Sequence, residues 1–172
     1  MQRNNSLRNP EWDYRSRGIY FITIITKNRS PYFGNIVSGI LEKTEIGSLV
    51  HNYWHEIPLH FKNIQLGQYI IMPDHLHGII HIKKQVNNRI INYLDEDLKN
   101  SKNVHMASIS PKPSSLSTII RSFKSAVTKD ARKIDLEFAW QRSFHDKIIQ
   151  KSEIPFYNKY MEENPGYFNE TQ

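Results

Sequence analysis

The chain contains no cysteine, which excludes disulfide bonds and zinc–thiolate sites and fits a reducing compartment. Long apolar runs are also missing. The longest, residues 22–25 and 69–72, are far too short to cross a bilayer. The first residues, MQRNNSLRNPEWDYRSRG, hold no apolar segment of the kind found in secretory signals. We therefore expect a soluble cytoplasmic protein with no membrane partner.

Acidic residues are outnumbered by basic ones in one segment of the chain. Residues 111–151 hold nine Lys or Arg and four Asp or Glu, and so carry five of the six net positive charges. A localised basic block suits a nucleic-acid backbone, where Lys and Arg displace counterions, although a solvated helix face would look the same. The candidate DNA-binding residues are Arg121, Lys124, Lys129, Arg132 and Arg142.

Aromatic residues are plentiful, with 9 Tyr, 8 Phe and 3 Trp in 172 residues, enough for one folded core. We expect a basic N-terminal arm, residues 1–17, before a single domain, residues 18–167. Periodicity and turn residues predict strands over 18–26, 68–82 (interrupted at Pro73) and 138–149, helices over 44–60, 115–133 and 152–163, and a mobile loop over 99–115.

Two histidines two residues apart are the sharpest chemical feature. Because side chains alternate along a strand, His75 and His77 point to the same face. Two imidazoles form an incomplete metal site with positions left for substrate oxygens, so a bound cation could withdraw charge from a phosphodiester. A bare His-x-His pair on a strand is more often structural, and the pair alone leaves both interpretations open.

The wider sequence resembles a known family. Tyr-Ile-Ile-Met-Pro-Asp-His-Leu-His-Gly-Ile-Ile, residues 69–80, is similar to the signature of HUH single-strand DNA transposases, and most of all to the REP-associated tyrosine transposase branch. Residues 18–26 with Arg29, Trp-Gln-Arg-Ser-Phe at 140–144 and Tyr-Met-Glu-Glu-Asn-Pro at 160–165 resemble other family blocks in the same order. The likeness covers residues 12–167.

The resemblance implies an α+β fold with a central antiparallel sheet flanked by helices, of the ferredoxin-like or RRM-like kind. It implies Mg or Mn held by His75 and His77. It also implies a tyrosine that attacks single-stranded or hairpin DNA, leaving a 5′-phosphotyrosine link and a free 3′-OH. The expected activity is therefore DNA transposition through metal-assisted nicking and joining. Relatives work as monomers or homodimers, and we favour the homodimer.

The nucleophile departs from the expected pattern. The resemblance places a tyrosine on the helix before the Trp-Gln-Arg block, but residues 117–133 contain none, and Thr128 or Ala131 fills its place. Either another tyrosine serves, or strand transfer has been lost, or the helix is misaligned. The other tyrosines considered are Tyr93, Tyr157 and Tyr160, and Tyr160 is the candidate nucleophile.

The rest of the metal site is open. Asp74 stands where the family usually has asparagine, and parity predicts that it faces away from His75 with little effect on a metal. Asp130 and His105 are candidates for a third ligand.

One further metal site and two rival functions remain open. His51 and His55 share a helical face and form a second, weaker candidate metal pair. The first rival function is a catalytically impaired DNA-binding relative that recognises hairpin or repeat DNA. The second is a hydrolase of small phosphates, which the extended basic segment argues against.

Overall fold

The computed structural model describes residues 17–83 and 115–168. The predicted N-terminal arm, residues 1–17, and the predicted loop, residues 99–115, fall almost wholly outside these residues. The elements are β1 (Gly18–Ile25), η1 (Lys27–Arg29), β2 (Gly34–Val37), β3 (Ile40–Lys43), α1 (Glu45–His60), β4 (Ile64–Met72), β5 (His75–Ile82), α4 (Leu116–Ile134), β6 (His145–Ile149), η2 (Lys151–Glu153) and α5 (Ile154–Phe168).

Four strands form the main sheet in the order β4-β5-β1-β6, and every neighbouring pair is antiparallel. β1 is rich in isoleucine, whose branched side chain suits a pleated, half-buried surface. β2 and β3 pair as a separate hairpin. The predicted α+β fold with a central antiparallel sheet flanked by helices is confirmed.

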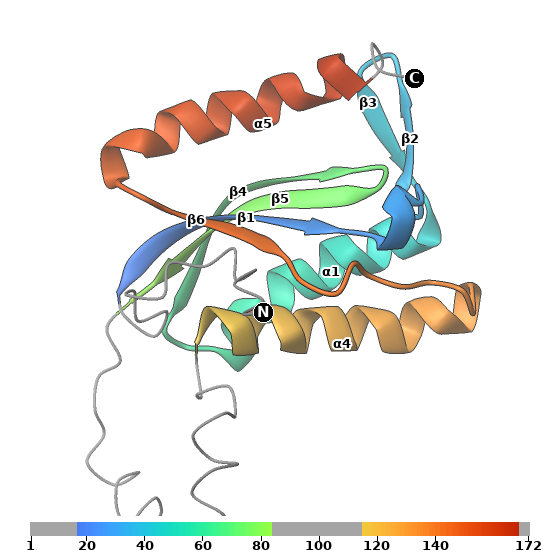
Figure 1. Cartoon of the computed structure of the whole chain (residues 1–172), viewed down its shortest axis with the longest axis horizontal. Helices are drawn as coiled ribbons and strands as arrows, with labels where there is room; N and C mark the ends of the chain where they lie inside the picture. Colours follow the sequence, from blue (N-terminus) through green and yellow to red (C-terminus); the bar gives the residue numbers. More distant parts are fainter. Residues whose placement is uncertain (1–16, 84–114, 169–172) are drawn as a thin grey trace, which may run out of the picture.

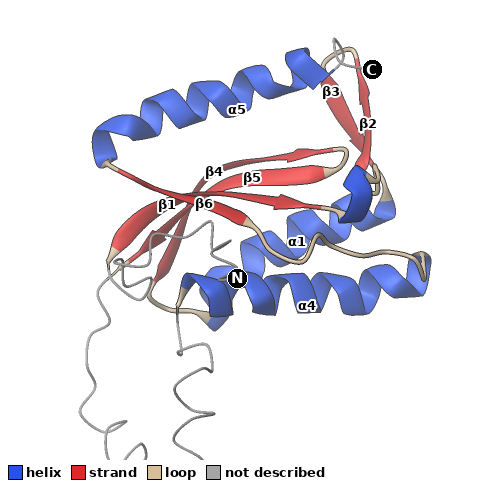
Figure 2. Ribbon diagram, in the orientation of Figure 1, coloured by secondary structure: helices blue, strands red, loops and turns tan. Residues whose placement is uncertain are grey.

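The sheet lies between two helical layers (Figures 1 and 2). α1 and α4 cover one face, where the large core gathers around side chains such as Tyr20, Leu76 and Phe123. α5 crosses the other face above a smaller cluster that includes Ile79 and Met161. Alternation along β5 therefore sends even-numbered side chains toward α1 and α4, and odd-numbered ones toward α5.

Proline interrupts a strand at one position but lies inside a helix at two others. Pro73 and Asp74 form the turn between β4 and β5, so the interrupted strand is a hairpin. Pro58 lies inside the last turn of α1, which continues to His60. The predicted end of the last helix at residue 163 is wrong, because α5 runs through Pro165 to Phe168. Proline late in a helix removes only one hydrogen bond near an end that frays in any case.

The predicted strand over residues 138–149 is shorter than expected, because only β6 joins the sheet. Residues 138–144 bend away, with a single bridge between Thr26 and Trp140. The Nζ of Lys124 donates to the carbonyl of Gln141 at 2.6 Å and approaches the next two carbonyls. These carbonyls therefore face a lysine rather than a neighbouring strand.

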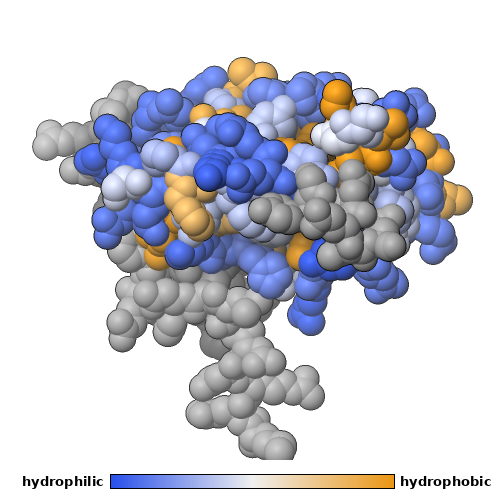
Figure 3. Space-filling view, turned by 90° about the horizontal axis from the view of Figure 1, so that it is seen from above, coloured by the Kyte–Doolittle hydropathy of each residue, from blue (hydrophilic) through white to orange (hydrophobic). Residues whose placement is uncertain are grey.

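The face of the molecule on the α5 side is mostly hydrophilic, with apolar side chains scattered through it (Figure 3). No helix in the described part of the chain combines the length and the apolar character needed to cross a membrane.

Gly78 marks a close approach between β5 and α1. A Cβ built on Gly78 would lie 2.5 Å from Cζ2 and 2.8 Å from Cη2 of Trp54. The Trp54 ring is fully buried and lies between the rings of Tyr69 and Phe123. Only glycine lets α1 approach β5 this closely.

Gly78→Ala should destabilise the fold by about 1–3 kcal/mol through overpacking. Urea unfolding would measure the change. The matched test is a double-mutant cycle with Trp54→Phe, whose smaller ring makes room for the new methyl group. The second substitution should recover part of the loss. Strictly additive effects of the two changes would contradict the close approach as the cause.

Candidate active site

His75 and His77 project together from β5 toward α5. Their Nε2 atoms are 3.1 Å apart, and their ring centroids are 4.6 Å apart. The ring of Phe21 on β1 stacks against His77 at 5.3 Å. The residues are 7% and 6% exposed, so access to the two nitrogens is narrow.

Each Nδ1 atom, on the other side of its ring, has a hydrogen-bond partner. Nδ1 of His75 lies 2.5 Å from Oδ1 of Asp74, and Nδ1 of His77 lies 2.8 Å from Oγ1 of Thr23. Since an ionised carboxylate only accepts, His75 donates through Nδ1, and the neutral form of an imidazole that does so carries its lone pair on Nε2. Such partners fix ring orientation in metal sites, and neither was identified as a site residue from the sequence.

The prediction that Asp74 faces away from His75 is wrong. Asp74 lies in the β4–β5 turn rather than in a strand, so strand alternation does not govern its direction. Its second oxygen accepts from Nη1 of Arg29 at 3.0 Å. Burial acts to raise the pKa of Asp74, but hydrogen bonds and charge from His75 and Arg29 hold that pKa below its usual value.

The segment after β1 clamps this turn. The backbone N–H and the hydroxyl of Thr26 both donate to the carbonyl of Asp74 at 2.9 Å. Asn28 and Arg29 then adopt left-handed φ values of 56° and 54°, which are uncommon outside glycine. This turn brings the Arg29 side chain to Asp74 while leaving it 66% exposed.

The two histidines fit a divalent cation. Burial, and next the neighbouring His75, lower the pKa of His77 to about 3, so its imidazole is neutral and able to coordinate. Two nitrogens on one octahedral cation at about 2.1 Å would lie about 3.0 Å apart. The observed Nε2 separation is close to this value.

A third protein ligand does not emerge from the described residues, among which no group of three His, Cys, Asp or Glu side chains could hold an ion. Asp130, predicted as a candidate, lies on α4 on the opposite face of the sheet. It accepts hydrogen bonds from Tyr53 and Lys133. His105 falls outside the described residues.

Among the described residues, Tyr160 is the tyrosine whose ring lies beside His77. Its ring on α5 lies 5.4 Å from the ring of His77 and 6.0 Å from that of Phe21, and the residue is 42% exposed. Tyr157, one helical turn earlier, is 7% exposed and packs on Phe21 at 4.5 Å, with Lys147 over its ring. The geometry therefore distinguishes an accessible phenol from a packing residue.

Residues 117–133, where the resemblance places the family's tyrosine, belong to α4, which packs on the other face of the sheet. Ala131 is fully buried there, and the hydroxyl of Thr128 donates to the carbonyl of Lys124 at 2.7 Å. Neither faces the histidines. Tyr93 falls outside the described residues.

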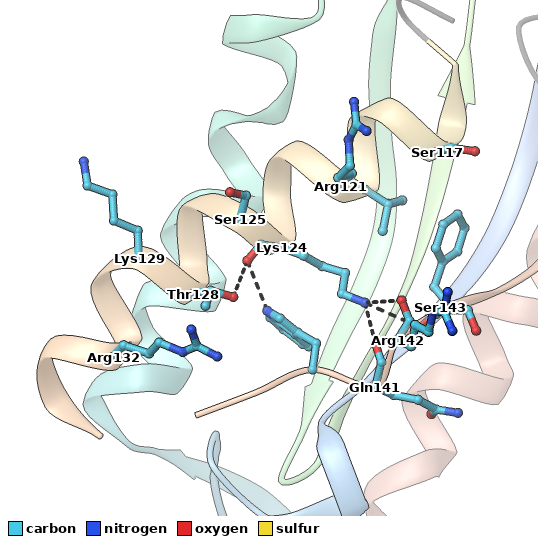
Figure 4. Close-up of a pocket in the computed structure, with 13 residues that line it drawn as sticks. Ser117, Arg121, Lys124, Ser125, Thr128, Lys129, Arg132, Gln141, Arg142 and Ser143 are labelled. Atoms are coloured by element: carbon cyan, nitrogen blue, oxygen red, sulfur yellow. Dashed lines mark hydrogen bonds between the residues drawn. The ribbon is translucent and has the colours of Figure 1, made fainter. Parts of the chain in front are cut away.

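The five predicted DNA-binding residues do lie together. Arg121, Lys124, Lys129, Arg132 and Arg142 all line a pocket of about 920 Å³ between α4 and residues 140–144 (Figure 4). This pocket lies on the α4 side, away from the histidines. Burial lowers the pKa of Lys124 to about 8, and its Nζ is engaged with backbone carbonyls.

His51 and His55 form a hydrogen-bonded group rather than an evident metal site. The hydroxyl of Tyr69 lies 2.7 Å from Nδ1 of His51 and 3.0 Å from Nε2 of His55. Burial, and then the charge of Lys43, lower the pKa of His51. Both rings thus share one phenol on β4.

Comparison with known proteins identifies relatives. No known protein-family profile matches the chain. A Haemophilus influenzae protein described as uncharacterised is 34% identical over 172 residues, covering 97% of this chain and 91% of its own.

Solved structures supply the fold. The structure of a REP-associated tyrosine transposase bound to a REP hairpin matches with a TM-score of 0.59 at 14% identity, over 94% of this chain and 74% of that one. A crystal structure from Deinococcus radiodurans matches over 91% of this chain and 95% of its own at 12% identity, but its TM-score of 0.46 is too low to support an argument. The chain belongs to one family with the Haemophilus influenzae protein, and its fold is that of a REP-associated tyrosine transposase.

Proposed function

We propose that this protein nicks and joins single-stranded DNA, with His75 and His77 holding Mg or Mn and Tyr160 acting as the nucleophile. The observation that carries the proposal is the meeting of three groups on one face of the sheet. Two converging imidazoles lie beside an accessible phenol. All three come from one chain, so the site needs no second copy. The REP hairpin bound by the structural neighbour supports DNA as the partner.

The chemistry is a transesterification. The Oη of Tyr160 forms a bond to phosphorus as the bond from phosphorus to the 3′ oxygen breaks. The phenolic proton leaves to solvent, and the departing 3′ oxygen takes up a proton. A divalent cation bound by the histidines would supply Lewis-acid withdrawal of charge from the phosphodiester. The reverse attack by a 3′-OH rejoins DNA and frees the tyrosine.

The neighbouring residues prepare the histidines for this task. Asp74 and Thr23 hold the outer nitrogens, which aims both Nε2 atoms at one point. Arg29 keeps the Asp74 carboxylate ionised and in place. These are positioning residues, since each acts through an imidazole.

The narrow access favours one alternative. With His75 and His77 only 7% and 6% exposed, a phosphate reaches Nε2 only after neighbouring side chains move. A protein that never made this movement would bind DNA without cutting it. A catalytically impaired relative that recognises hairpin or repeat DNA is therefore the second candidate.

A covalent protein–DNA adduct is the first expected result. Incubation of the wild type with labelled single-stranded hairpin DNA and Mn²⁺ should give a band that survives denaturing electrophoresis. Tyr160→Phe and His77→Ala should give no detectable adduct, because the nucleophile or a metal ligand is lost. Tyr157→Phe is the matched control and should retain the adduct. Retarded DNA with no adduct in the wild type would establish the DNA-binding alternative instead.

Metal affinity gives a second expectation that does not depend on activity. Asp74→Ala should weaken Mn²⁺ binding by about 10–100-fold in calorimetry, since partners of this kind orient and strengthen ligating histidines. Asp74→Asn should bind Mn²⁺ with an affinity between those of the wild type and Asp74→Ala, because an amide oxygen can still accept from Nδ1. Asp130→Asn, on the opposite face of the sheet, should bind as the wild type does. Unchanged affinity in Asp74→Ala would rule out the positioning role.

A further inference from the structure

The basic pocket on α4 does not end at residues 140–144. A second pocket of about 530 Å³ adjoins it and is lined by residues 26–29 and 140–142. The two pockets share Trp140, Gln141 and Arg142 in their walls. They therefore meet along this segment, and together we call them the wrap-around groove.

The groove is strongly positive. Its basic lining residues are Lys27, Arg29, Arg121, Lys124, Lys129, Arg132 and Arg142. Among the described residues, no aspartate or glutamate lines either pocket. Charge of one sign along a hollow surface is complementary to a nucleic-acid backbone.

The second pocket lies at the end of the sheet where β1 ends and β5 begins. Gln141 is joined there to the end of β1, with its N–H donating to the carbonyl of Ile25 at 2.9 Å. Ile25 lies opposite His75 in the register of β1 and β5. Arg29, which lines this pocket, also contacts Asp74, the partner of His75. One end of the groove is thus connected to His75 through two hydrogen bonds, from Arg29 to Asp74 and from His75 to Asp74.

Aromatic side chains interrupt the basic ones. Trp140 and Phe144 are part of the wall and are only partly buried. Trp140 is held by its Nε1, which donates to the carbonyl of Lys124 at 3.2 Å, and by the rings of Phe33 and Phe138. Lysines and arginines that alternate with fixed aromatic rings characterise surfaces on which unpaired bases stack.

We propose that the wrap-around groove carries a single DNA strand from the α4 face around the end of the sheet to His75 and His77. The proposal rests on the function proposed above and adds the path of the substrate. Lys124 builds the path by holding the carbonyls of residues 141–143. The exposed Arg121, Lys129 and Arg142 contact phosphates. This path explains how basic residues on one face serve chemistry on the other.

The absence of cysteine allows a direct test. Two pairs of cysteines would be introduced, Ser125→Cys with Gln141→Cys, and Ser125→Cys with Lys27→Cys. Each pair would be offered oligothymidines of about 15 nucleotides carrying two tethered thiols at varied spacing, in EDTA so that no cleavage occurs. Doubly cross-linked product should peak at a shorter spacing for the first pair, because Gln141 lies between the other two positions along the groove. Ser125→Cys with Ser152→Cys, which lies outside both pockets, should show no preferred spacing.

Equal optimal spacings for the two pairs, or a Lys27→Cys thiol that never captures a strand held at position 125, would overturn the path. The outcome of this cross-linking test is independent of the outcome of the adduct assay. Ordered spacing without an adduct leaves a DNA track on a protein that does not cut. An adduct without ordered spacing means that DNA reaches Tyr160 by another path.

Affinity supplies an independent measurement. Fluorescence anisotropy with the unmodified oligothymidine should give a logarithmic salt dependence whose slope falls by about 0.7 for each phosphate contact removed. Arg121→Ala and Arg142→Ala should each show this loss and weaker binding. Lys62→Ala, exposed and outside both pockets, is the matched control and should keep the wild-type slope. An equal loss in Lys62→Ala would mean that DNA binds the basic surface without using the groove.

Discussion

The pairing of β1 with β5 is the constraint on which the site depends. Its register sets Thr23 opposite His77 and Ile25 opposite His75. The first pair allows the hydroxyl of Thr23 to hold Nδ1 of His77. At the same end, Thr26 binds the carbonyl of Asp74 and so fixes the turn whose carboxylate holds His75. A slip of one residue would reverse the faces of β1 and remove these partners.

The two faces of the sheet also differ in what they contribute. The large core under α1 and α4 provides most of the buried apolar surface, which leaves only a small cluster beneath α5. The chemical groups lie in that thinner layer, where phenol and imidazole rings take places that aliphatic side chains would otherwise fill. A layer with fewer apolar contacts opens at lower free energy than the core, as the proposed function would require for a phosphate to reach the two nearly buried histidines.

Much of the fold was predictable because it depends on local periodicity. The strand at 18–26 and the helix beginning at Ser115 were found within a residue or two, since alternation and an N-cap serine are read from neighbouring residues. The shared face of His75 and His77 follows from the same alternation. Register and layer assignment were not predictable. Thr23 as a partner of His77, and α4 on the opposite face from the site, both depend on contacts between segments far apart in the chain.

The orientation of Asp74 was predicted wrongly for a local reason, because strand parity was extended through a turn. The choice between Tyr157 and Tyr160 shows a subtler limit. Both residues lie on the side of α5 that meets the sheet, so helical spacing alone cannot rank them. What ranks them is where α5 begins. The Gln150 N–H donates to the Glu153 carboxylate at 2.7 Å in a capping box at η2, directly after β6. This cap sets the position relative to the sheet at which α5 begins. With α5 beginning there, Tyr160 rather than Tyr157 lies beside His77.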